Sequence, residues 1–162
     1  MKPRIYFDTN PFIWTIEEIS DRSELLNAIL ATSGAGKSPA VVTSEITLAE
    51  LLVLPLRNRQ EDLARRYDDL IYPSPWLNVR PVDRAVLWRA SALRAGGRIK
   101  LLDAIHLATA ELTGCTYFLS ADTDFAAYLP RNKPDLSGAN PSLVLATPDL
   151  PTLTTLLDRF AP

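Results

Sequence analysis

Short apolar segments alternate along this chain with longer segments whose apolar residues recur at helical spacing. Five short segments are predicted to be strands, residues 4–7, 40–43, 77–82, 116–119 and 142–146, and those at 4–7 and 116–119 are rich in β-branched and aromatic residues. Strands that alternate with helices are typical of a parallel sheet. We therefore expect an α/β fold of three layers, α/β/α, with a central parallel sheet of about four to five strands.

Helix boundaries are predicted from capping residues and helix breakers. Asn10 as N-cap and Pro11 as first helical residue predict a helix that continues over residues 12–19. A second helix should run from Ser20 or Asp21 to about Thr32, with Glu24 completing a pattern that resembles a capping box. The remaining expected helices cover residues 45–54 (capped by Ser44 and broken by Pro55), 58–72, 83–93 (capped by Asp83), 102–112 (ended by Gly114) and 152–160, with one helical turn at 125–129 and a polar loop at 130–141.

Length and composition fit one soluble domain. The chain has 162 residues, of which 47% are hydrophobic and 22% charged, enough for a core without disulfides or a structural metal. We expect a single domain over residues 1–162, no membrane span and no signal peptide. The lone cysteine, Cys115, excludes an internal disulfide and a cysteine zinc cluster, and it favours a cytoplasmic location, where it would act as a small buried hydrophobe.

Charge is unevenly distributed along the chain. Residues 57–100 carry ten Lys or Arg and five Asp or Glu, a surplus of +5, whereas the remainder carries −7, which together give the net charge of −2. A basic region beside an acidic site suits an enzyme that acts on a polyanion. Arginine is also common on exposed helix faces, so this region alone does not establish such a function.

Acidic residues follow two of the expected strands. Asp8 ends the first strand, and Asp122 and Asp124 come shortly after the strand at 116–119. Ligands of open α/β sheets bind at this carboxyl end of the strands. Asp103, at the start of an Ala-rich helix, and Glu50, beside the apolar face of another, are further acids whose charges must be solvated, paired or bound to a metal.

These acids offer only hard oxygen ligands, and the chain has neither a Cys cluster nor more than one His. Mg²⁺ or Mn²⁺ is therefore expected, in preference to zinc or copper. A carboxylate site of this kind requires a substrate with negative oxygens, such as a phosphodiester, whose hydrolysis a divalent cation promotes. His106 lies one turn from Asp103, but a single histidine on an Ala-rich helix packs more often than it catalyses, and we do not assign it as a general base.

The order of motifs resembles that of the PIN-domain ribonucleases, and most closely the VapC-type toxins of toxin–antitoxin pairs. The motifs are YFDTN at 6–10, TLAELL at 47–52, LLDAIHLATA at 101–110 and FLSADTDF at 118–125. The resemblance implies an acidic quartet that binds metal, with an additional acid and a nearby hydroxyl from Ser120 or Thr9. The quartet would be Asp8, Glu50, Asp103 and Asp122, and the additional acid Asp124.

By the same resemblance, the protein would be an endoribonuclease that uses Mg²⁺ or Mn²⁺ and leaves a 5′-phosphate and a 3′-hydroxyl. It would form a homodimer and be held inactive by a small VapB-like antitoxin, for which Phe12, Trp14 and the early helices offer contact surface. Three alternatives remain open. They are a PIN-like module that binds RNA or protein without cutting, a haloacid-dehalogenase-type phosphatase, disfavoured because Asn10 stands where its second acid should be, and a purely structural protein.

Overall fold

Five parallel strands form one sheet in the computed structural model, which describes residues 3–35, 38–129 and 143–160. The strand order is β3-β2-β1-β4-β5, and every neighbouring pair is parallel. The strands are β1 (Ile5–Phe7), β2 (Val41–Ser44), β3 (Leu77–Arg80), β4 (Tyr117–Leu119) and β5 (Val144–Ala146). The parallel α/β sheet expected from the alternation of strands and helices is confirmed, with five strands.

Successive side chains of each strand point to opposite faces of the sheet, and this separates two hydrophobic cores. Ile5, Phe7 and Leu119 belong to one core. Tyr6 and Phe118 belong to the other. Because both faces are covered, β1 and β4 are buried along their whole length, and their sequences are continuously apolar.

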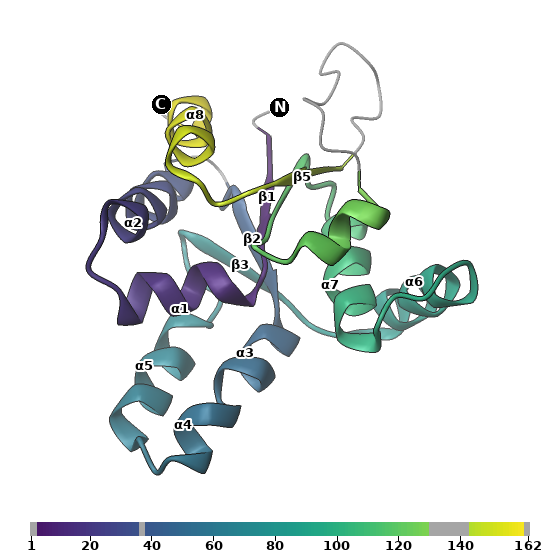
Figure 1. Cartoon of the computed structure of the whole chain (residues 1–162), viewed down its shortest axis with the longest axis horizontal. Helices are drawn as coiled ribbons and strands as arrows, with labels where there is room; N and C mark the ends of the chain where they lie inside the picture. Colours follow the sequence, from purple (N-terminus) through teal and green to yellow (C-terminus); the bar gives the residue numbers. More distant parts are fainter. Residues whose placement is uncertain (1–2, 36–37, 130–142, 161–162) are drawn as a thin grey trace.

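Helices cover the two faces and form the outer layers (Figure 1). The first core packs against α1, α2, α3, α5 and α8, and the second against α6 and α7. Their bounds are α1 (Thr9–Glu17), α2 (Asp21–Ser33), α3 (Glu45–Leu51), α4 (Val53–Arg57), α5 (Glu61–Leu70), α6 (Arg84–Ala95), α7 (Leu101–Leu112) and α8 (Leu150–Phe160), with a 3₁₀ helix, η1, at Thr123–Ala127. The three-layer α/β/α arrangement is thus confirmed.

The first helix begins earlier than its capping residues predict. Its N-cap is Asp8, and Asn10 and Pro11 lie inside the first turn. The prediction that Asn10 caps this helix was wrong, because Pro11 does not have to be the first helical residue. Proline is tolerated throughout the first turn, where the helix needs no backbone N–H donor. Asp8 therefore connects the two elements directly, because it follows the last residue of β1 and is the N-cap of α1.

Two other predicted boundaries also differ from the structure. The capping box of α2 joins Ser20 and Ser23, whose hydroxyls and backbone N–H groups bond reciprocally, rather than Asp21 and Glu24. Pro55 does not end a helix but lies in the first turn of α4, which follows α3 after a break at Leu52. The predicted caps Ser44 and Asp83 are confirmed, and Gly114 follows α7 with a φ of +67°, a conformation that glycine adopts readily. The loop predicted at 130–141 lies outside the described residues.

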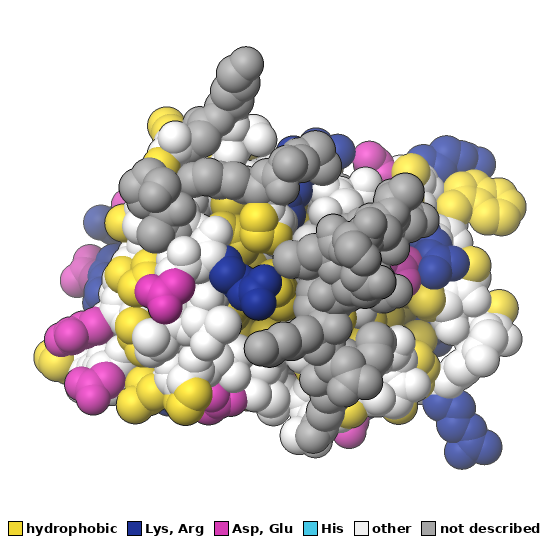
Figure 2. All heavy atoms as spheres, turned by 90° about the horizontal axis from the view of Figure 1, so that it is seen from above, with side chains coloured by type: hydrophobic (Ala, Val, Ile, Leu, Met, Phe, Trp, Pro, Cys, Tyr) yellow, Lys and Arg dark blue, Asp and Glu magenta, His cyan; other side chains and the backbone are white. Residues whose placement is uncertain are grey.

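Among the described helices, none is long and apolar enough to cross a membrane. Charged side chains of both signs are interspersed with hydrophobic ones on the face seen in Figure 2. Cys115 is buried, and burial raises the pKa of its thiol to about 12, which agrees with its expected role as a small hydrophobe. Phe12 is fully buried, so the prediction that it offers contact surface was wrong.

Candidate metal centre

The site is built around the adjacent carboxyl ends of β1 and β4. Phe7 and Leu119, the last residues of these strands, are partners in the sheet. The residues that follow them, Asp8 and Ser120, are therefore brought together, although they are far apart in sequence. The Ser120 hydroxyl donates a hydrogen bond of 2.6 Å to Oδ2 of Asp8, and both residues are buried.

Asp8 occupies the N-cap of α1 but does not use its side chain as a cap. An N-cap aspartate ordinarily accepts a hydrogen bond from a backbone N–H of the first turn. Asp8 accepts one from Ser120 instead, so its carboxylate is directed into the site, while the N-terminal end of α1 supplies favourable positive potential beside it.

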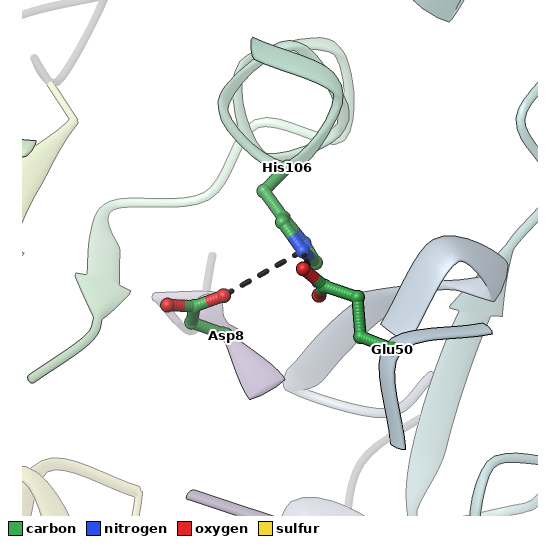
Figure 3. Close-up of side chains that lie close together, drawn as sticks. All are labelled: Asp8, Glu50 and His106. Atoms are coloured by element: carbon green, nitrogen blue, oxygen red, sulfur yellow. Dashed lines mark hydrogen bonds and ion pairs between the residues drawn. The ribbon is translucent and has the colours of Figure 1, made fainter. Parts of the chain in front are cut away.

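Glu50 reaches the same place from α3, and His106 from α7 (Figure 3). Nε2 of His106 lies 2.8 Å from Oε2 of Glu50 and 3.6 Å from Oδ1 of Asp8. Ligand atoms of Asp8, Glu50 and His106 all lie within 4.8 Å of one another. The Thr9 hydroxyl also donates to Oε2 of Glu50. Both hydroxyls implied by the resemblance, Thr9 and Ser120, therefore contact an acid of the quartet.

Asp103 and Asp122 lie outside that closest group, but Asp103 interacts electrostatically with Asp8, His106 and Asp122. Partial burial raises the pKa of Asp103, and the nearby negative charges of Asp122 and Asp8 raise it further, against the opposing effect of Lys100. A carboxyl whose ionisation is resisted by neighbouring carboxylates belongs to a negative cluster. The structure thus brings the four acids of the quartet into one electrostatic neighbourhood.

The loop that carries Asp122 is held by local hydrogen bonds. The backbone N–H of Asp122 donates to the Ser120 hydroxyl over 3.0 Å, and Oδ1 of Asp122 accepts from the backbone N–H of Asp124 over 2.8 Å. Ser120 therefore links two acids of the quartet, because it donates to Asp8 and accepts from the Asp122 backbone. Asp122 caps η1 through Oδ1, and its other carboxylate oxygen, Oδ2, takes no part in this cap.

Asp124 differs from the quartet in its surroundings. Its side chain is 71% exposed and lies 3.9 Å from the Lys100 ammonium. Together with Asp103 it lines a cavity of about 310 Å³, whose other walls include Arg98, Lys100 and Tyr128. This cavity places two cations and an aromatic ring next to an acid of the quartet.

Glu50 and His106 shift each other's pKa. Burial alone raises the pKa of Glu50, but the hydrogen bond and charge of His106, with the hydrogen bond from Thr9, lower it overall. Burial alone lowers the pKa of His106, but the hydrogen bond to Glu50 and the charges of Asp8, Glu50 and Asp103 raise it overall. Glu50 is therefore ionised at neutral pH.

Tyr6 and His106 make a contact beside the carboxylates that the sequence did not predict. His106 is only 1% exposed, and Nδ1 of its ring lies 2.7 Å from the hydroxyl of the fully buried Tyr6. The available signal was the spacing of His106, three residues after Asp103, which puts the two on one side of a helix.

A parallel α/β sheet with converging carboxylates at the carboxyl end of its strands defines a protein equipped to bind a hard divalent cation. The family model of the PIN domain matches residues 5–128, and the chain belongs to the PIN-domain family. Members of this family are nucleases that use divalent metals, which supports a nuclease activity. The matched region contains every residue of the site described above. Among curated proteins, no sequence match was found.

Solved structures similar to this chain come from toxin–antitoxin systems. A chain of a toxin–antitoxin complex from Klebsiella pneumoniae is 28% identical, with a TM-score of 0.54 and coverage of 75% of this chain and 90% of that chain. VapC20 of Mycobacterium tuberculosis, a toxin that cleaves the sarcin–ricin loop, is 21% identical, with a TM-score of 0.59 and coverage of 76% and 94%. A chain of VapBC2 from Rickettsia felis, solved with promoter DNA, is 16% identical, with a TM-score of 0.61 and coverage of 88% and 98%.

Proposed function

We propose that this protein is a Mg²⁺- or Mn²⁺-dependent endoribonuclease and the toxin of a type II toxin–antitoxin pair. The observation that carries the proposal is the convergence of Asp8 and Glu50, with Asp103 and Asp122 beside them, in a family of nucleases. Without a cation, so many carboxylates in a half-buried cluster would repel one another. A site of that kind is suited to a substrate whose phosphates complete the coordination.

The donor set fits a hard divalent cation. Asp8, Asp103 and Asp122 supply carboxylate oxygens, which Mg²⁺ and Mn²⁺ prefer. When bound, such a cation would lower the pKa of water and neutralise the charge that develops on the phosphate. Glu50, ionised and held by Thr9 and His106, would orient the attacking water or hold a second ion. Asp124 is an additional ligand in this proposal.

RNA would be held next to these acids by cations of the basic region. Arg98 and Lys100 line the cavity beside Asp103, where they can bind phosphates of the strand, and Tyr128 offers a ring against which a base can stack. Two arginines of the region that lie elsewhere are in ion pairs, Arg89 with Glu111 at 2.5 Å and Arg65 with Glu61 at 3.5 Å. We assign RNA binding to Arg98 and Lys100 because they line the cavity beside Asp103.

We further propose that residues 1–162 form a single domain, that the protein is a cytoplasmic homodimer, and that a small VapB-like antitoxin inhibits it. The single domain is supported by the one sheet to which all described strands belong. The antitoxin is supported by the similarity to chains of toxin–antitoxin complexes, and the dimer is an expectation from the family resemblance. The antitoxin would contact the exposed side chains of the early helices and the part of the half-buried Trp14 that the core and Arg22 leave uncovered.

The proposal is tested by incubating the purified protein with RNA in Mg²⁺, in Mn²⁺ and in EDTA. We expect cleavage with either metal, 5′-phosphate and 3′-hydroxyl ends, and activity at the EDTA level for Asp8→Asn and Asp103→Asn. Asp69→Asn on α5, which makes the same substitution at an exposed aspartate outside the carboxylate cluster, should cut as the parent does. An active Asp103→Asn variant, or cleavage that persists in EDTA, would refute the assignment.

The second candidate function is a PIN-like module that binds RNA or protein without cutting it. It predicts binding that does not depend on metal, and normal growth of cells that express the chain. The intact quartet disfavours it, because a binding module gains nothing from a cluster of partly buried carboxylates facing a polyanion. Growth arrest that disappears with Asp103→Asn would exclude this alternative.

A further inference from the structure

His106 is the sole histidine of the chain, and both nitrogens of its ring are engaged in the protein interior. Nδ1 lies 2.7 Å from the Tyr6 hydroxyl, and Nε2 lies 2.8 Å from Oε2 of Glu50. Tyr6 is fully buried and His106 is 1% exposed. Tyr6, His106 and Glu50 come from β1, α7 and α3, so the contacts join three elements around the site. Figure 3 shows His106 and Glu50 pointing toward each other.

The direction of each hydrogen bond follows from the number of protons available. An ionised carboxylate can only accept, so Nε2 of His106 must carry a proton and donate it to Glu50. In the neutral imidazole Nδ1 then has a lone pair and accepts. The fully buried Tyr6 hydroxyl supplies the matching donor. When the ring is neutral, these two bonds select its Nε2–H tautomer, and when it is protonated on both nitrogens, Nε2 still donates to Glu50.

This arrangement decides which carboxylate oxygens a cation can reach. Oε2 of Glu50 already accepts from His106 and Thr9, and Oδ2 of Asp8 accepts from Ser120. The other oxygens, Oε1 of Glu50 and Oδ1 of Asp8, accept no hydrogen bond from side chains in the described part of the chain. The cluster of Asp8, Glu50 and His106 thus contains two oxygens for metal, rather than two oxygens and a nitrogen.

The hydrogen bond to Glu50 also occupies the nitrogen that His106 would need as a ligand. The 2.8 Å between Nε2 and Oε2 of Glu50 is an ordinary hydrogen-bond length. Ligation by His106 would also require Nε2 to lose its proton and Nδ1 to gain one, which would leave the Tyr6 proton without this acceptor.

We propose that Tyr6 and His106 are positioning residues. The hydrogen bond from Tyr6 keeps the neutral His106 ring in its Nε2–H tautomer. His106 then donates to Oε2 of Glu50, so that Oε1 of Glu50 and Oδ1 of Asp8 face the cation. The inference rests on the proposed function, because it concerns the metal site of that nuclease. It goes further in excluding the one nitrogen of the cluster from coordination and in giving a task to a buried tyrosine.

The tautomer can be measured directly by ¹⁵N NMR of histidine-labelled protein, since a single ring contributes to the spectrum. At alkaline pH we expect a protonated Nε2 and a bare Nδ1, both without metal and with excess Mg²⁺. A bare Nε2 with protonated Nδ1 after addition of Mg²⁺ would show ligation and overturn the inference, and so would a ring protonated on both nitrogens at alkaline pH. This measurement requires no cleavage activity.

Variants test the positioning role through metal affinity. His106→Leu removes the donor, whereas His106→Gln keeps a side-chain N–H that can bond to Glu50. We expect His106→Leu to weaken Mn²⁺ binding about 10-fold or more, as loss of a partner of a metal ligand does. His106→Gln should restore most of the affinity, and Tyr6→Phe should show a smaller loss. Mn²⁺ binding is measured by calorimetry, and cleavage is measured separately.

Tyr67→Phe is the matched control, because it removes the hydroxyl of another buried tyrosine, which donates to Glu17 at a different place in the fold. It should leave Mn²⁺ binding and cleavage unchanged. Should His106→Leu fail to fold, His106→Gln and Tyr6→Phe still decide the matter. Folded His106→Leu with parental Mn²⁺ affinity would overturn the inference. A wild type that binds Mn²⁺ with the expected tautomer but cuts no RNA would refute only the proposed function.

Discussion

Single residues of the site have the same chemical type but different environments, and these differences assign their tasks. Asp8 is buried and bonded to Ser120, whereas Asp124 is exposed and faces Lys100. Glu50 is held by two donors that lower its pKa against the effect of burial. Asp103 has the opposite balance, because burial and neighbouring charges raise its pKa. The acid with the raised pKa is the one that gains most from a cation.

Asp103→Asn should therefore stabilise the metal-free protein at neutral pH. A raised pKa in the folded state means that ionisation of Asp103 favours the unfolded chain. The penalty is absent below the ordinary aspartate pKa of about 3.9, grows as pH rises, and is complete above the folded pKa. We expect a higher Tm than that of the parent in EDTA at neutral pH, and a difference that vanishes in acid.

Added Mg²⁺ should reverse this order, since it stabilises the parent more than a variant that has lost a ligand. Thermal unfolding in EDTA and in Mg²⁺ at two pH values checks both statements. Asp69→Asn serves again as the control for the loss of one exposed negative charge. A parent that is as stable as Asp103→Asn in EDTA at neutral pH would contradict the electrostatic description of the cluster.

At the scale of elements, α7 connects the site to the core. Its first turn carries Asp103, and His106 follows three residues later on the same side. The remainder of the helix is buried against the sheet and against α6. Any displacement of α6 and α7 would thus move an acid and its neighbouring histidine together.

The start of α6 is fixed by Asp83, whose side chain accepts a 3.0 Å hydrogen bond from the backbone N–H of Val86.

Asp83→Ala should lower the free energy of unfolding by about 1 kcal/mol, because it removes this helix cap. Asp83→Asn retains an acceptor oxygen and should cost much less. Urea denaturation followed by circular dichroism measures both variants. The cap lies outside the carboxylate cluster, so both should bind Mn²⁺ as the parent does. An equal loss of stability in the two variants would show that charge, and not the hydrogen bond, is what matters at Asp83.

At the scale of the whole molecule, the last helix, α8, packs into the same hydrophobic core as the first strand, β1. Leu153, Leu156 and Phe160 of α8 are buried in the same core as Ile5 and Phe7 of β1. Figure 1 shows α8 beside α2, on the opposite side of the sheet from α6 and α7. The strand that carries Asp8 is therefore stabilised by residues from the other end of the chain.

Phe160→Ala should cost about 3–5 kcal/mol, the usual loss for a buried phenylalanine. That is a large share of the roughly 5–15 kcal/mol that stabilises an ordinary domain. Leu150→Ala, at the 43% exposed first residue of the same helix, should cost less than about 1 kcal/mol. Urea midpoints of the two variants give the comparison. Similar losses would mean that α8 does not seal the core as described.

Local sequence patterns were sufficient for the elements and for their arrangement in layers. Short apolar runs identified β1, β2, β4 and β5, because the side chains of these parallel strands are buried on both faces. The edge strand β3 was also predicted, although its Asn78 and Arg80 are not buried. The helix boundaries predicted at Asn10 and Pro55 were wrong. Proline is tolerated anywhere in the first turn of a helix, so its position does not fix where the helix begins or ends. The end-of-strand position of Asp8 and Asp122 followed from the same patterns.

The sequence by itself determined the class of fold, the order of its elements and the acids that stand at strand and helix ends, since these depend on periodicity over a few residues. Only the tertiary structure decided which atoms meet. The bonds from Ser120 to Asp8, Tyr6 to His106 and His106 to Glu50 join residues 112, 100 and 56 positions apart. Such contacts arise when strands pair and helices pack. For that reason the occupied and the free oxygens of the site, and the tautomer of its histidine, are properties of the folded molecule.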